Sequence, residues 1–147
     1  MKKIIILILL IVLTISGTIY WLNETSSAKL IETYKIREQK DDFIVHIRVE
    51  RNGDGFQILR SLQYIGSETI TIDHRTPLTS VSINQENHDF TGSHVTKTLE
   101  PNYIYHPQEP ESYSPLEKGS YNLYIHSQFF VDGEPFNVYS EQEIVFH

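Results

Sequence analysis

Cysteine is absent from the chain of 147 residues. The absence excludes structural disulfides, a lipid-modified N-terminal cysteine and a thiol nucleophile. If the domain is exported, it therefore depends on its hydrophobic core alone for stability. A domain of this kind is more typical of a bacterial cell envelope than of a eukaryotic secreted protein.

Sequence signatures of catalysis are also missing. The chain has no Gly-x-Ser-x-Gly motif, and its acids show no pattern of paired carboxylates. Residues 53–55, Gly-Asp-Gly, lack the third glycine and the following helix of a dinucleotide site, so a turn is expected there. We expect a protein that is not an enzyme and that has no catalytic residues and no cofactor.

The seven histidines are not spaced as metal ligands usually are. No two of them are separated by one, two or three residues, whereas zinc and copper sites favour such short spacings. His88 and His94, which flank a polar loop containing Asp89, form the best local cluster. We expect no metal site, and a metal-binding envelope domain that uses His88 and His94 is kept as an alternative.

Basic residues are scarce in the C-terminal third. Between residues 98 and 147 the only base is Lys118, against eight acids, and the chain after Ala28 has a net charge of −8. Such a surface repels phosphate backbones and anionic lipid headgroups. Nucleic acid binding is therefore disfavoured, and the folded domain is expected to stand off the membrane.

The N-terminus carries a long hydrophobic run. Residues 4–22 contain no charge and would form a helix about 28 Å long, close to the thickness of a bilayer core. Lys2 and Lys3 precede the run, and Tyr20 and Trp21 lie at its far end. This arrangement favours an N-terminus in the cytoplasm and a C-terminal domain outside.

Two interpretations of this segment stay open. Residues 1–28 are predicted to be a membrane anchor with a short stalk, so that the protein is a single-pass protein of the cell membrane. The alternative is a signal peptide cleaved near Ala28, since Ser26 and Ala28 are small residues, and cleavage would release a secreted domain.

From residue 42 the chain alternates apolar and polar residues with the period of a β-strand. Turn signals recur about every 8 to 12 residues, as in sandwich folds. Residues 29–147 are therefore predicted to form an all-β domain, an immunoglobulin-like antiparallel β-sandwich of seven or eight strands. Residues 23–41 fit neither a strand nor a helix period cleanly, so a first strand and a short helix both stay open.

Residues 100–119 contain four prolines and predict an edge strand followed by a long surface crossover. Tyr103, Tyr105 and Tyr113 in this segment are candidates for protein contacts, because exposed aromatics with few lysines are typical of interfaces. The edge could also accept an added strand. The alternative is that Tyr103 and Tyr105 only cover the edge of the sandwich.

Gly119 and Tyr121 begin the longest predicted strand, directly after the proline-rich segment. In immunoglobulin-like sandwiches a tyrosine at this corner packs its ring inward, and its hydroxyl bonds to the backbone a few residues upstream. We predict that role for Tyr121, the alternative being an ordinary tyrosine on a core face.

Several stretches resemble the BsuPI-type proteinase inhibitor domain. They are Leu-Glu-Pro at 99–101, PLEKGSYNLYI at 115–125 and ILRSLQYIGSETITI at 58–72. The chain departs from the family at Asn102, where the family has a turn glycine, and at Lys118, where it has a proline. It also resembles membrane-anchored proteins of Bacillus-type bacteria. The resemblance implies an immunoglobulin-like fold and, as one alternative, a secreted proteinase inhibitor, although no inhibitory residue can be carried over.

The features together favour a non-catalytic envelope protein. We expect it to contact the membrane through residues 4–22 and an envelope protein partner through its sandwich, without binding nucleic acid.

Overall fold

The computed structural model describes residues 2–24 and 28–147. Met1 and residues 25–27 lie outside the described part, as do the side chains of residues 2–4, 7 and 22–24. Ser26 of the predicted cleavage region is among the residues left out.

The hydrophobic run forms a helix, α1 (Lys2–Glu24). The hydroxyls of Thr14 and Thr18 donate to carbonyls one turn earlier, at 2.9 to 3.1 Å, so their polar atoms are satisfied inside the helix. Within the described residues, no helix has both the length and the apolar character that a membrane span requires.

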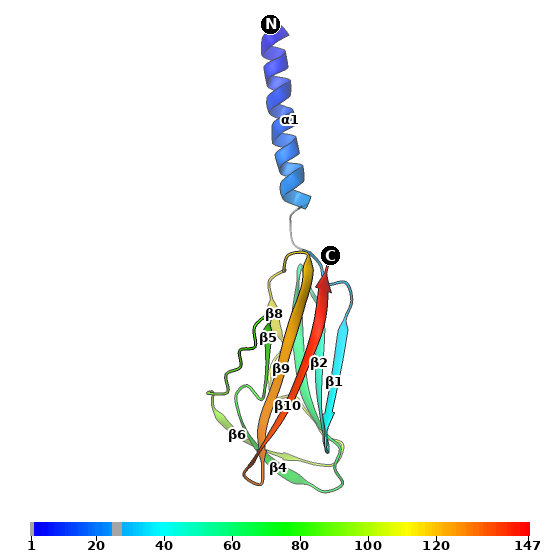
Figure 1. The fold of residues 1–147 in the computed structure, drawn as a ribbon, viewed down its shortest axis with the longest axis vertical. Helices are drawn as coiled ribbons and strands as arrows, with labels where there is room; N and C mark the ends of the chain where they lie inside the picture. The colour runs from blue at the N-terminus through cyan, green and yellow to red at the C-terminus, as the bar shows by residue number, and fades with distance from the viewer. Residues whose placement is uncertain (1, 25–27) are drawn as a thin grey trace.

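The rest of the described chain forms two antiparallel sheets packed face to face (Figure 1). The first sheet has the order β1-β2-β3, and both β7 and β8 pair with the far edge of β3. The second has the order β10-β9-β4-β6, with β5 also paired to β9. The first sheet contains β1 (Tyr34–Lys40), β2 (Phe43–Asn52), β3 (Gly55–Tyr64), β7 (Ile104–Tyr105) and β8 (Glu111–Tyr113). The second contains β4 (Ile70–Arg75), β5 (Thr79–Ile83), β6 (His94–Leu99), β9 (Gly119–Val131) and β10 (Glu134–Phe146).

The all-β, two-sheet architecture predicted from the alternation is confirmed. The described residues form ten strands, however, where the sequence predicted seven or eight. One reason is the proline-rich segment, which gives two short edge strands, β7 and β8, in place of one. The segment at 34–40, for which a helix was also open, is strand β1, because it pairs along its whole length with β2.

Residues 106–110 between β7 and β8 bridge the two sheets. The side-chain amide of Gln108 accepts a hydrogen bond from the Thr79 amide at 2.9 Å and donates one to the Thr79 carbonyl at 3.1 Å. It thus takes the place of a neighbouring strand beside β5. Pro107 and Pro110 flank it, and because proline cannot donate to a ladder, they interrupt pairing with β3 here.

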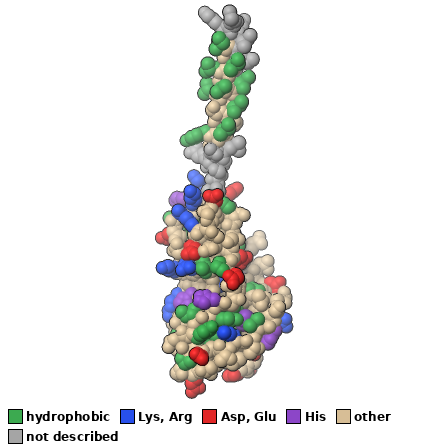
Figure 2. Space-filling view, turned by 180° about the vertical axis from the view of Figure 1, so that it is seen from behind, with side chains coloured by type: hydrophobic (Ala, Val, Ile, Leu, Met, Phe, Trp, Pro, Cys, Tyr) green, Lys and Arg blue, Asp and Glu red, His purple; other side chains and the backbone are tan. Residues whose placement is uncertain are grey.

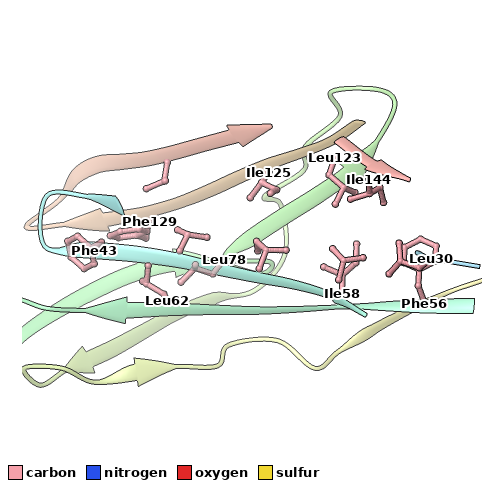
Figure 3. Packing of buried hydrophobic residues seen from close by; sticks show 14 of the residues in the cluster. Leu30, Phe43, Phe56, Ile58, Leu62, Leu78, Leu123, Ile125, Phe129 and Ile144 are labelled. Atoms are coloured by element: carbon pink, nitrogen blue, oxygen red, sulfur yellow. The ribbon is translucent and has the colours of Figure 1, made fainter. Parts of the chain in front are cut away.

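The core lies between the two sheets (Figure 3). Phe43 connects them, because its ring lies 4.8 Å from that of Phe129 and 5.0 Å from that of Phe136, centroid to centroid. Burial of each large apolar side chain contributes about 1.5 to 3 kcal/mol. The largest fully buried side chains are Leu30, Ile47, Phe56, Ile58, Leu62, Ile72, Leu78, Leu99, Leu123, Phe129, Ile144 and Phe146.

The first residues of the sandwich are hydrogen-bonded to residues near its C-terminal end. Lys29 and His147 exchange two backbone hydrogen bonds of 2.8 and 3.0 Å, and the Ala28 amide donates to the Leu116 carbonyl at 3.1 Å. Ala28 and Leu30 are buried in the core cluster. The chain therefore enters the sandwich at Ala28, beside the C-terminus.

Tyr121 makes the contact expected of a corner tyrosine. Its hydroxyl donates to the Glu117 carbonyl at 3.0 Å, and its ring meets that of Phe146 edge-on at 5.5 Å. Gly119 has a φ of +151°, a conformation that favours glycine. Asn102 has a φ of +63°, in the left-handed region that asparagine tolerates better than most residues.

Candidate binding surface

Two of the predicted interface tyrosines lie together at the edge of the sandwich. The ammonium of Lys97 lies 5.2 Å from the ring centroid of Tyr103 and 5.4 Å from that of Tyr105, so it contacts both rings. The Tyr105 hydroxyl lies 3.0 Å from Nε2 of the buried His74. Tyr103 is 40% exposed and offers the freer surface of the two.

His74 is neutral in this arrangement. Its Nδ1 lies 2.9 Å from the Arg75 carbonyl, which can only accept, so Nδ1 carries the proton and Nε2 accepts from the Tyr105 hydroxyl. Burial lowers the pKa of His74, and burial raises the pKa of Tyr105. Tyr105 therefore has an internal role in the fold.

Tyr113 lies apart from the other two. Its ring stacks on Phe56 at 5.0 Å with an angle of 10°, and it packs against the core. Burial raises the pKa of Tyr113 to about 12. The structure thus brings Tyr103 and Tyr105 together but places Tyr113 over the other end of β3.

The histidines chosen as a possible metal pair have separate partners. Nδ1 of His88 lies 3.0 Å from the Ser80 hydroxyl, whereas Nε2 of His94 lies 3.5 Å from an Asp73 carboxylate oxygen. Burial, followed by the charge of His126, lowers the pKa of His88. Among the described residues, no group of three or more metal-ligating side chains is placed to hold an ion.

A different feature, which we call the basic groove, lies on the outer face of the first sheet. The register of β1, β2 and β3 places two rows of side chains across the strands. One row is Lys35, Arg48 and Leu59, and the other is Arg37, His46 and Ser61. The groove between them has a volume of about 440 Å³, within the range of ligand sites, and His106 also lines it.

No Asp or Glu is among the described residues that line the basic groove. Arg48 is paired with Glu50 at 2.9 Å, but Lys35 and Arg37 form no ion pair with any described residue. Arg37 donates only to the neutral amide of Gln39, at 3.2 Å. Two cationic side chains are therefore free to bind an anion.

The groove places basic side chains side by side. Lys35 lies directly across from Arg48, and Arg37 from His46. Like charges opposite one another destabilise a sheet. His46 is held in place by Gln63, with Nε2 and Oε1 2.9 Å apart. Figure 2, which views the molecule from behind Figure 1, shows Lys, Arg and His side chains along the left side of this face, at about the middle of its height.

The basic groove could not be seen from the net charge, because a net charge does not show where the basic residues cluster. Seven of the ten Lys and Arg residues after Ala28 fall within residues 29–60. Arg48 occupies an outward position of a predicted strand, which was a readable signal, whereas Lys35 and Arg37 lie in a segment whose strand could not be assigned from sequence. The acidic balance of residues 98–147 concealed it.

The chain matches no protein-family model, and no curated protein sequence is significantly similar to it.

Proposed function

We propose that the chain is a non-catalytic protein of the cell envelope, whose immunoglobulin-like sandwich binds an acidic protein surface through the basic groove. The observation that carries the proposal is a groove whose lining includes the outward-facing Lys35, Arg37 and Arg48 and, among the described residues, no acid. An acidic partner would offset the repulsion between Lys35 and Arg48, which face each other across β1 and β2. Protein interfaces commonly use arginine in this way.

A labelled deca-glutamate peptide is a suitable probe for the groove. We expect the full chain in detergent micelles to bind it, and binding to weaken as salt rises. Lys35→Glu with Arg37→Glu should weaken binding by about tenfold or more, because the charge that meets the peptide is reversed. Fluorescence anisotropy measures the dissociation constant.

A matched control carries the same charge change elsewhere. Arg75→Glu with Lys118→Glu alters two bases that do not line the basic groove. Equal losses in both double variants would mean that binding follows net charge and would contradict the assignment. Absence of binding by the unmodified chain would contradict it as well.

We also propose that the sandwich lies outside the cytoplasm, held by residues 4–22. The support is the charge-free hydrophobic sequence, with Lys2 and Lys3 before it. Fractionation of cells that express the full chain should place it with membranes, and external protease should digest residues 29–147. Recovery of an intact, protease-protected chain in the cytosol would rule out this location.

A proteinase inhibitor is the second candidate. Its specific support is Asn102, whose positive φ fits the turn at which the resembling family has glycine. Incubation of the full chain with a subtilisin-like protease should then slow hydrolysis of a peptide substrate. Unchanged hydrolysis at a large excess of the chain would exclude this function.

A further inference from the structure

The outer face of the second sheet carries a pocket of opposite character, which we call the acidic pocket. Its volume is about 330 Å³, and it lies against β9, β10 and the loop after β5. Its lining residues are Glu86, His88, Tyr124, Ile125, Tyr139, Ser140 and Glu141. None of these is Lys or Arg, and burial lowers the pKa of His88, which keeps this side chain neutral at neutral pH.

Tyr139 gives the acidic pocket a rigid aromatic wall. It is 59% exposed, yet its ring stacks on that of the buried His126 at 4.2 Å and 22°. His126 is fixed in turn, because its Nε2 lies 2.8 Å from Oδ1 of Asn137. An exposed aromatic face beside two carboxylates is suited to a lysine or arginine side chain, which gains cation–π and ionic contacts together.

The acidic pocket and the basic groove lie at the same level of the sandwich, on opposite faces. β1 and β10 run side by side. Near one end the Val145 amide donates to the Tyr34 hydroxyl at 3.0 Å, and near the other the Lys40 ammonium donates to the Asn137 carbonyl at 2.9 Å. Between these two contacts, residues of β1 taken from Tyr34 toward Lys40 lie beside residues of β10 taken from Val145 back toward Asn137.

Lys35 and Arg37 of β1 and Glu141 and Glu143 of β10 therefore lie between the same two contacts along the sandwich. The side chains of Glu141 and Tyr139 face outward from the second sheet, beside Tyr124 and His126. A simple translation perpendicular to the sheets would bring the carboxylates of one molecule opposite the bases of the next.

We propose that the occupant of the basic groove is a second copy of this chain, which presents its acidic pocket, so that sandwiches stack face to back. The inference rests on the function proposed for the groove and names its partner. Lys35 and Arg37 of one copy enter the pocket formed by Tyr139, Glu141 and Glu86 of the next. The two contacting surfaces differ, so the association is heterologous and can continue through further copies.

Face-to-back stacking is compatible with a common membrane. α1 lies beyond one end of the sandwich, and β1, β2, β9 and β10, which carry the two binding faces, run along its long axis (Figure 1). Translation perpendicular to the faces leaves every copy in the same orientation, with all helices on one side. Copies anchored in one bilayer can therefore associate laterally without tilting.

Charge reversal provides the test, with the full chain in detergent micelles and energy transfer between donor- and acceptor-labelled copies as the readout. The unmodified chain should associate at low salt and dissociate as salt rises. Lys35→Glu with Arg37→Glu makes both faces acidic, and Glu141→Lys with Glu143→Lys makes both basic. Each variant alone should associate about tenfold more weakly, or more.

An equimolar mixture of the two variants should regain energy transfer, because the acidic faces of one then meet the basic faces of the other. Matching thermal unfolding of the variants establishes that they are folded. No recovery in the mixture of folded variants overturns the proposal, as does an unmodified chain that shows no transfer at low salt. If that chain still binds deca-glutamate, the groove keeps its proposed function and only the identity of its partner is wrong.

Discussion

The buried arginine of β3 allows one energetic prediction to be worked out in detail. Arg60 lies on the inner face of the strand, between Ile58 and Leu62, and its side chain is 3% exposed. Its Nη2 binds the Glu111 carboxylate and lies 3.5 Å from the Tyr113 hydroxyl. Its Nε has no partner among the described residues. A buried guanidinium with one counter-charge and one unpaired nitrogen is costly to keep.

Glu111→Gln removes the counter-charge and keeps the shape of the side chain. Loss of one partner from a fully buried ion pair costs about 3 to 5 kcal/mol. The side chain of Glu111 is 54% exposed, so solvent already screens the pair. We therefore discount the expected loss in the free energy of unfolding to about 2 kcal/mol.

Arg60→Met removes the buried charge and the unpaired Nε at the same time. Its expected effect lies within about 1 kcal/mol of zero, because replacement of a buried ion pair by a packed apolar side chain is often neutral or stabilising. In the Arg60→Met background, Glu111→Gln should cost less than about 0.5 kcal/mol.

Chemical denaturation of the full chain in detergent, followed by circular dichroism, measures all four corners of this double-mutant cycle. Glu109→Gln is the matched control, since Glu109 is exposed in the same segment. The reasoning is refuted if Glu111→Gln costs the same with and without Arg60. It is equally refuted if Arg60→Met alone costs more than about 3 kcal/mol, the scale of a lost core side chain.

Three further predictions concern stability. Burial lowers the pKa of His74 below its usual 6.5, so the unfolded chain binds a proton at this histidine more tightly than the folded chain does. The free energy of unfolding should therefore fall as the pH drops below 6.5. Denaturant titrations at pH 7.5 and 5.5 should show a smaller fall for His74→Gln. Tyr121→Phe removes the hydrogen bond to the Glu117 carbonyl and should lower the free energy of unfolding by about 1 kcal/mol in a denaturant titration, with an unchanged circular dichroism spectrum. An unchanged free energy of unfolding would mean that this hydrogen bond does not stabilise the domain. Gln108→Ala removes both bonds to Thr79 and should cost about 2 kcal/mol, whereas a loss of a few tenths would mean that water replaces the amide.

The strand pattern could be predicted where local and global signals agree. In β2 and β3, alternation assigns Val45, Val49, Phe56 and Ile58 to the inner face, and all four are buried there. The same alternation puts Arg60 on the inner face, so a charged side chain occupies a position that the pattern assigns to the apolar core. Such a misplaced charge can be recognised in the sequence, but the acid that pairs with it, Glu111, comes from an edge strand distant in the sequence.

β1 illustrates what local signals could not decide. Its residues fit both periods poorly, since Tyr34, Ile36 and Glu38 are only partly buried. Pairing with β2 makes the segment a strand, and that contact is tertiary. The tyrosines of the edge show the same limit, because the interactions of Tyr105 and Tyr113 depend on His74 and Phe56, which belong to other strands.

Sequence alone determined which side chains of each strand share a face, where the turns fall and that one N-terminal segment is hydrophobic, because these properties depend on neighbours within a few residues. Tertiary structure decided where the charges meet. The side-chain period of two fixes a face but not the neighbouring strand or its register. Only the pairing of β1, β2 and β3 sets Lys35 beside Arg48 and so gathers a basic face in a chain whose net charge is negative.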